Sequence, residues 1–283
     1  MSLTSSNLFP PIPADTDIAA RFVFTSGNFY LAIGNHINQL FFGLYLDNPF
    51  GWNQNPERTL AMLYLITIFQ YVETIPDWEA AEALRMRVDW KYALHLPLDY
   101  FGLDISSFCT FRRWLLADQD HQHNLQILLE RLAQITMLPR KRPISLQTNT
   151  IIKTVCLQSR LAVAWRALSN VLSILAIEYP EWLRKVTLPN WYVRYGQNGQ
   201  VLYSAEKSIE QEDLAELIGR DGVYLLTAIA DANSPMPENL PEITALKQVW
   251  QDQFQVIGGK IVWRKESCSG CASTSRSLVS TLQ

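Results

Sequence analysis

The segment around residues 55–73 constrains the fold most, because it predicts a helix that is apolar nearly all the way round. Asn55-Pro56 is a cap-then-proline pair, which is typical of a helix start. A helix without a polar face has to lie at the centre of its domain. The apolar run 60–69, between Arg58 and Glu73, is about half the roughly 20 residues that a bilayer requires. We therefore predict a core helix and no membrane span. The residues at helical spacing are Leu60, Leu63, Tyr64, Ile68 and Tyr71.

Other segments extend this helical pattern on both sides of one basic run. Before it, the sequence predicts helices over residues 77–87, over 105–116 behind an Asp104 cap, and over 121–137. The run Arg140-Lys141-Arg142-Pro143 predicts a linker. After it we expect one strand at 151–155, which is rich in β-branched residues, and helices at 161–177, 211–218, 222–230 and 241–254. Residues 256–263 predict a hairpin that turns at Gly258-Gly259.

These signals predict a mainly α protein with a short hairpin and at most one further strand. Pro10, Pro11 and Pro13 predict an irregular leader over residues 1–20. A helical domain follows over 21–140, then a second, mostly helical region over 141–265. The Ser-rich residues 266–283 carry hardly any charge, and we expect them to be disordered.

Composition excludes some functional classes. The net charge is −3, from 24 Lys and Arg against 27 Asp and Glu, which rules out a broadly basic nucleic-acid protein but not a local basic face. Four cysteines in 283 residues do not form a disulfide framework, and the first residues do not form a signal peptide. We therefore expect a cytoplasmic protein.

The residues themselves reveal no catalytic site. No Asp occurs between Asp120 and Asp213, and the later acids, such as Asp213 and Glu216, suggest a solvated helix face. Cys268 and Cys271 have the spacing of half a zinc site, without a second pair nearby. No glycine-rich phosphate loop is present. We predict no cofactor and no metal site.

Basic residues recur beside aromatic ones in the first domain, and this pattern favours nucleic acid. Arg85 and Arg87 precede Trp90-Lys91-Tyr92, and Phe111-Arg112-Arg113-Trp114 lies within the predicted 105–116 helix. Such a helix could enter a major groove. The same pattern also fits arginines in surface ion pairs and aromatics in the core, since residues 57–142 hold 10 Lys and Arg against 11 Asp and Glu.

Several blocks resemble one protein family. Residues 70–85 (QYVETIPDWEAAEALR), 88–98 (VDWKYALHLPL) and 101–108 (FGLDISSF), followed by Phe111-Arg112-Arg113, are similar to the InsH-type N-terminal domain of bacterial insertion-sequence transposases. The likeness continues at 180–184, 191–195 and 249–263, so it covers about residues 8–265. It implies a helical domain that binds the terminal repeats of the element. It also implies an RNase H-like catalytic domain with an Asp-Asp-Glu triad and divalent metal.

The chain departs from this family in two ways. The first catalytic Asp of the family belongs to a T-D-S/A-T block after the linker, where this chain has Gln147-Thr148-Asn149-Thr150. A neutral amide does not replace a carboxylate that bridges two cations. The chain also ends about where the next blocks of the family would begin, so that the RNase H-like core is expected to be incomplete.

The resemblance therefore predicts a truncated, catalytically inactive transposase that binds double-stranded DNA. Because transposases commonly act as multimers on paired ends, it also implies a homo-oligomer. Two alternatives remain open: a transposase completed by a second polypeptide from a downstream frame, and a decayed product without activity. The predicted DNA contacts combine helix-start N–H groups and guanidinium forks with flanking cations. They are Ser106, Ser107, Arg112 and Arg113, then Arg85, Arg87 and Lys91, and finally Arg140, Lys141 and Arg142.

Overall fold

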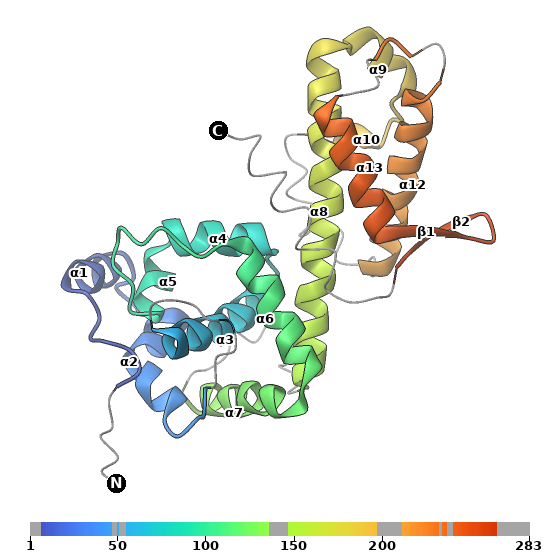
Figure 1. The fold of residues 1–283 in the computed structure, drawn as a ribbon. Coiled ribbons are helices and arrows are strands. Elements are labelled where there is room, and N and C mark those ends of the chain that lie inside the picture. Colours follow the sequence, from blue (N-terminus) through green and yellow to red (C-terminus); the bar gives the residue numbers. More distant parts are fainter. Residues whose placement is uncertain are drawn as a thin grey trace. The chain divides into compact units, whose positions relative to one another are not determined.

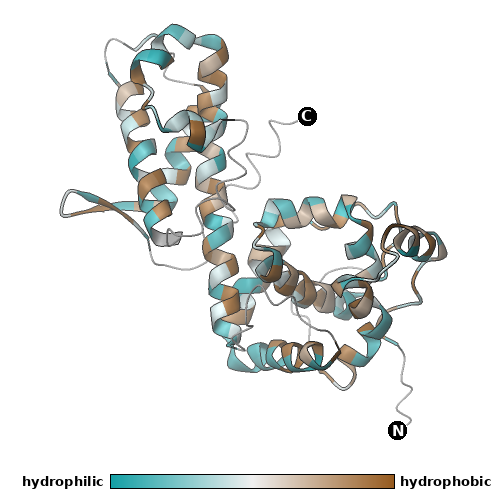
Figure 2. Cartoon of the chain, turned by 180° about the vertical axis from the view of Figure 1, so that it is seen from behind, coloured by the Kyte–Doolittle hydropathy of each residue, from teal (hydrophilic) through white to brown (hydrophobic). Residues whose placement is uncertain are grey.

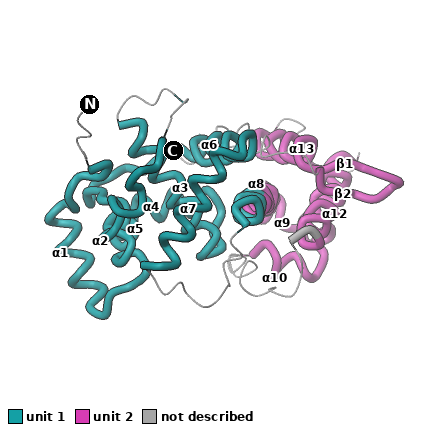
Figure 3. The backbone as a smooth tube through the Cα atoms, turned by 90° about the horizontal axis from the view of Figure 1, so that it is seen from below, with its two compact units in different colours: residues 1–156 teal, residues 157–283 magenta. Residues whose placement is uncertain are grey.

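The computed structural model describes residues 7–46, 50, 55–135, 147–196, 211–231, 234–236 and 240–264. The described part is mainly helical, with one two-stranded antiparallel hairpin (Figure 1). It divides into two compact units, residues 1–156 and 157–283 (Figure 3). The division falls inside one long helix, after Cys156, and each unit is described separately below.

Unit 1 is built around the helix that the sequence placed at its centre. Every residue of α3 (Pro56–Glu73) from Leu60 to Tyr71 is buried, which confirms the prediction of a helix that is apolar on all sides. Figure 2 shows the brown, hydrophobic residues along it. The remaining helices of this unit cover it or extend from it. They are α1 (Ala14–Val23), α2 (Phe29–Phe41), α4 (Asp77–Met86), α5 (Val88–Ala93), α6 (Ile105–Ala117), α7 (Gln119–Ile135) and the first turns of α8 (Thr148–Glu178).

The prediction of an irregular leader was wrong from residue 14 onward. Pro13 is the N-cap of α1, so the prolines precede this helix and do not interrupt it. The first turn of α1 carries Asp15 and Asp17, and its last turn carries Arg21, as the helix dipole favours. The Thr16 hydroxyl donates a hydrogen bond to the Leu96 carbonyl at 2.8 Å and so ties α1 to the domain.

Unit 2 holds the remainder of α8 and a small helical core. Its other elements are α9 (Pro180–Val186), α10 (Trp191–Tyr195), α12 (Gln211–Ile229), α13 (Pro241–Gln253) and the hairpin of β1 (Phe254–Ile257) and β2 (Lys260–Trp263). The core packs Leu168 and Leu175 of α8 against Trp191, Leu225 and Leu246.

Two predictions of local structure in the second half were wrong. Residues 151–155 are helical, because Ile151, Ile152 and Val155 are buried together at helical spacing, and packing overrides their β propensity. The segments 211–218 and 222–230 form the single helix α12. Its glycines allow close packing and do not end the helix, since a Cβ at Gly222 would stand 1.9 Å from Trp250 Cζ2.

The hairpin prediction was confirmed. Phe254 pairs with Trp263 and Ile257 with Lys260, on either side of a two-residue turn. Gly258 and Gly259 have φ values of 58° and 77°, which fit a type I′ turn and favour glycine at both positions.

Helix α8 has one further property. Among the described helices, it is the one single helix that is long and apolar enough, by length and composition, to cross a membrane. Core helices of soluble proteins share this property, and part of α8 is buried inside the protein.

Candidate nucleic-acid interface

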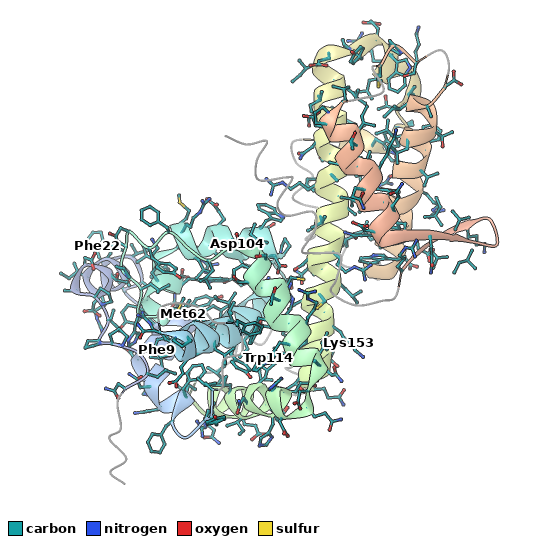
Figure 4. The ribbon with its side chains drawn as sticks, in the orientation of Figure 1. Phe9, Phe22, Met62, Asp104, Trp114 and Lys153 are labelled. Atoms are coloured by element: carbon teal, nitrogen blue, oxygen red, sulfur yellow. The ribbon has the colours of Figure 1, made fainter. Side chains whose placement is uncertain are left out.

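Helix α6 carries four of the predicted DNA contacts, and Asp104 fixes its start. The Asp104 carboxylate accepts a hydrogen bond from the Ser106 N–H at 2.7 Å, and the Asp104 carbonyl accepts one from the Ser107 N–H at 2.9 Å. Both N–H groups that we expected to bind phosphate are therefore occupied. The hydroxyls of the two half-buried serines remain as polar groups for a ligand. Figure 4 labels Asp104 and Trp114 on this helix.

Arg112 does not lie at the surface, so its assignment as a DNA contact was wrong. Its side chain is fully buried and forms two hydrogen bonds to Asp77, from Nη1 at 2.7 Å and from Nη2 at 2.6 Å. Gln70 donates to the same carboxylate at 2.9 Å. Gln70, Asp77 and Arg112 lie on α3, α4 and α6, so their hydrogen bonds join these three helices. The pairing also satisfies the two buried charges, which would be costly to leave without a partner in the core.

Arg113, the next residue, is exposed. Its guanidinium lies 3.5 Å from the Thr110 hydroxyl, one turn earlier on the same helix. Ser106, Thr110 and Arg113 follow the i, i+4, i+7 spacing of one helix face. Thr110 was missed by the sequence analysis, although projecting residues 105–117 onto a helix would have placed it there. We call Ser106, Ser107, Thr110 and Arg113 the α6 face.

Arg85 lies beside the start of α6. A Cβ at Gly102 would stand 3.1 Å from the Cγ of Arg85, so the end of α4 meets the loop that leads into α6. The Arg85 side chain is half exposed and forms an ion pair with Glu82. On the exposed parts of α4 and α6 and at the α6 cap, two acids, Glu82 and Asp104, stand against two cations, Arg85 and Arg113. The local surface is therefore polar and close to neutral, not strongly basic.

Arg87, a further predicted contact, is partly exposed and engaged within unit 1, and its role in DNA binding stays a prediction. Arg87 pairs with Glu73 and Asp89, and its guanidinium lies over the rings of Tyr30 and Trp90 at 5.1 and 5.3 Å.

Lys91 is buried, and its Nζ donates to the Leu98 carbonyl, so its assignment as a DNA contact was wrong. Burial lowers the pKa of this ammonium group. Arg140, Lys141 and Arg142 lie outside the described residues.

The sequence resemblance directed attention to Asn149 and to the carboxylates that follow it. Asn149 is exposed in the first turn of α8. This helix also contains residues 151–155, which we had expected to form a strand. Asp213 and Glu216 are exposed on α12, and Asp221 is buried against Arg194 and Tyr195. Within the described ranges, no group of three His, Cys, Asp or Glu side chains is arranged to hold a metal ion.

The cysteines and histidines add no site to the described part of the chain. Cys109 is buried and is not disulfide-bonded, whereas Cys156 is disulfide-bonded. Cys268 and Cys271 lie outside the described residues. His121 stacks on Trp114 with ring centroids 3.6 Å apart, so that this ring belongs to the packing between α6 and α7.

Comparisons with known proteins give no independent identification: no family model matches the chain, and neither the curated proteins nor the solved structures contain a match.

Proposed function

We propose that this chain is a DNA-binding protein of the insertion-sequence transposase type, and that unit 1 binds the ends of its element. The observation that carries the proposal is the resemblance of residues 70–108 to the N-terminal domain of those transposases. This block contains the end of α3, all of α4 and α5 and the start of α6.

The α6 face supports the proposal physically. The bond between Arg112 and Asp77 turns one side of α6 into the core and leaves Ser106, Thr110 and Arg113 on its outer side. The two short hydroxyl side chains allow the helix to approach a DNA groove closely and can bond phosphate. The guanidinium can bond phosphate or guanine. Arg85 is the second exposed cation near this helix start.

A different residue, Asn149, supports binding without cleavage. Asn149 supplies no carboxylate at the position of the first catalytic Asp, and two-metal chemistry requires negatively charged oxygen ligands. We infer that this chain does not cut DNA by itself. A second polypeptide that brings the carboxylates would restore a transposase, whereas a decayed product would bind no DNA specifically.

A mobility-shift titration tests the proposal. The full chain is titrated against duplexes from the ends of its element and against shuffled duplexes, each at two salt concentrations. The control for Arg113→Ala is Arg184→Ala, which also removes one exposed helix arginine but lies on α9 in unit 2, beside Glu181.

We expect preferential binding to the end sequences. Arg113→Ala should weaken binding about tenfold and reduce the salt slope by about one, and Arg184→Ala should change neither. Equal binding to both duplexes would contradict the proposal. Unchanged affinity of Arg113→Ala would remove the α6 face from it.

A further inference from the structure

The β1–β2 hairpin has a fixed base and a free tip. Phe254 and Trp263 are buried at the base, only 5% and 6% exposed, and are paired across the strands. The base packs on α12 at Gly219, where a Cβ would stand 2.7 Å from the Phe254 ring. At the tip, Val256 and Ile257 are 69% and 56% exposed. Figure 1 shows the hairpin projecting sideways from the end of α13 and past α12.

The exposed tip has no role in the packing of unit 2. A two-stranded hairpin is marginal on its own, and here its stability comes from the buried base. The two-residue glycine turn keeps the end narrow, since neither Gly258 nor Gly259 carries a side chain. Val256 and Ile257 are neighbours in one strand and therefore point to opposite faces, so each face of the narrow tip carries one largely exposed β-branched side chain.

Charge indicates what kind of partner fits. Between Asp252 and Glu266 the sequence contains three cations, Lys260, Arg264 and Lys265, and no acid, although the whole chain has a net charge of −3. Lys260 is exposed and lies opposite Ile257 in the register. Arg264 Nε donates to the carbonyls of Phe254 at 3.0 Å and of Gln251 at 3.2 Å, and neither carbonyl neutralises its charge.

We propose that the tip of this hairpin is a second DNA-contacting element, which inserts Val256 and Ile257 at a base step in the minor groove while Lys260 binds a flanking phosphate. This inference rests on the proposed function and extends it to unit 2. Apolar wedges flanked by cations are a recurring means of minor-groove binding, and the duplex is the polyanion that a cationic, acid-free segment complements.

The test uses the full chain and two variants of the tip. Val256→Thr with Ile257→Thr keeps β-branched side chains, so the strands are retained while the wedge becomes polar. Lys260→Glu reverses the charge. The matched control is Lys247→Glu, which makes the same charge change at an exposed position of α13. Thermal unfolding verifies that each variant is folded, and sedimentation records the oligomeric state.

We expect the double threonine variant and Lys260→Glu each to weaken binding to the end duplex by about tenfold, and Lys260→Glu to reduce the salt slope by about one or more. Lys247→Glu should leave both unchanged.

If the tip variants bind as the original chain does while Arg113→Ala is weakened, the hairpin inference is overturned and the proposed function stands. If the original chain binds no DNA, both fall. If the threonine variant instead dissociates a dimer without changing affinity for DNA, the tip binds a second copy, and the inference is wrong.

Discussion

The ion pair between Arg112 and Asp77 gives the sharpest test of how unit 1 is held together. Both side chains are buried, 0% and 7% exposed, and two hydrogen bonds of 2.7 and 2.6 Å join them. Arg112→Met would leave a carboxylate in the core, with Gln70 as one remaining donor. Removing one partner of a buried pair costs about 3–5 kcal/mol. In a unit of this size that corresponds to a fall in Tm of roughly 6–20 °C.

The assay is urea and thermal unfolding of four proteins: the original chain, Arg112→Met, Asp77→Asn and the double variant. Because the two groups act as one unit, the loss in the double variant should be about 1–3 kcal/mol smaller than the sum of the single losses. The neighbouring Arg113→Ala serves as the control and should change stability by less than about 0.5 kcal/mol, since this side chain is exposed. The reasoning fails if Arg112→Met unfolds like the original chain but loses DNA affinity, because Arg112 would then act at the surface.

Three further outcomes follow from the packing. Gly222→Ala should destabilise unit 2 by at least about 1–3 kcal/mol, because the added methyl group would overlap the Trp250 ring; an unchanged melting temperature would contradict this. Arg131→Ala should lower the free energy of unfolding by about 1.5–3 kcal/mol, because Nη1 of Arg131 donates to two carbonyls at the end of α2, at 2.6 and 2.8 Å. Hydrogen exchange should show faster opening of the last turn of α2 in this variant. Equal protection of that turn in both proteins would contradict the prediction. Burial raises the pKa of the Tyr64 hydroxyl, so the neutral form is favoured in the folded state. The contribution of this hydroxyl to the free energy of unfolding is fully present below its pKa in the unfolded chain, about 10. This contribution is lost as the pH rises above that value toward the higher pKa of the folded state. Tyr64→Phe should therefore show a flatter decline in stability between pH 9 and 11, and a slope equal to that of the original chain would refute this assignment.

Local signals in the sequence were enough for α3, α4, α6 and α7 of unit 1 and for the hairpin, but not for α1, α2 and α5. The apolar pattern of residues 60–71, the Asp104 cap and the Gly258-Gly259 turn each specify a local structure through spacing, capping or backbone conformation. The helix α2 was missed, although Asn28 caps it and accepts a hydrogen bond from the Leu31 N–H at 2.8 Å. Asn28 would have marked this start.

Long-range packing decided the elements that these signals placed wrongly. The β-branched residues 151–155 favour a strand in isolation, but as part of α8 they bury Ile151, Ile152 and Val155 on one face. In α12, Gly219 and Gly222 resemble helix breaks in the sequence. The rings of Phe254 and Trp250, distant along the chain, occupy the space that their missing side chains leave.

At the candidate site, two adjacent arginines show which features follow from local sequence signals and which follow from long-range packing. The sequence predicted a helix over residues 105–116 that contains both Arg112 and Arg113, and α6 confirms it. Successive side chains of an α-helix are about 100° apart around its axis, so Arg112 and Arg113 point in different directions. Which of them enters the core depends on Asp77, 35 positions earlier, and only the tertiary structure brings that carboxylate to α6. It buries Arg112 in the core and leaves Arg113 exposed.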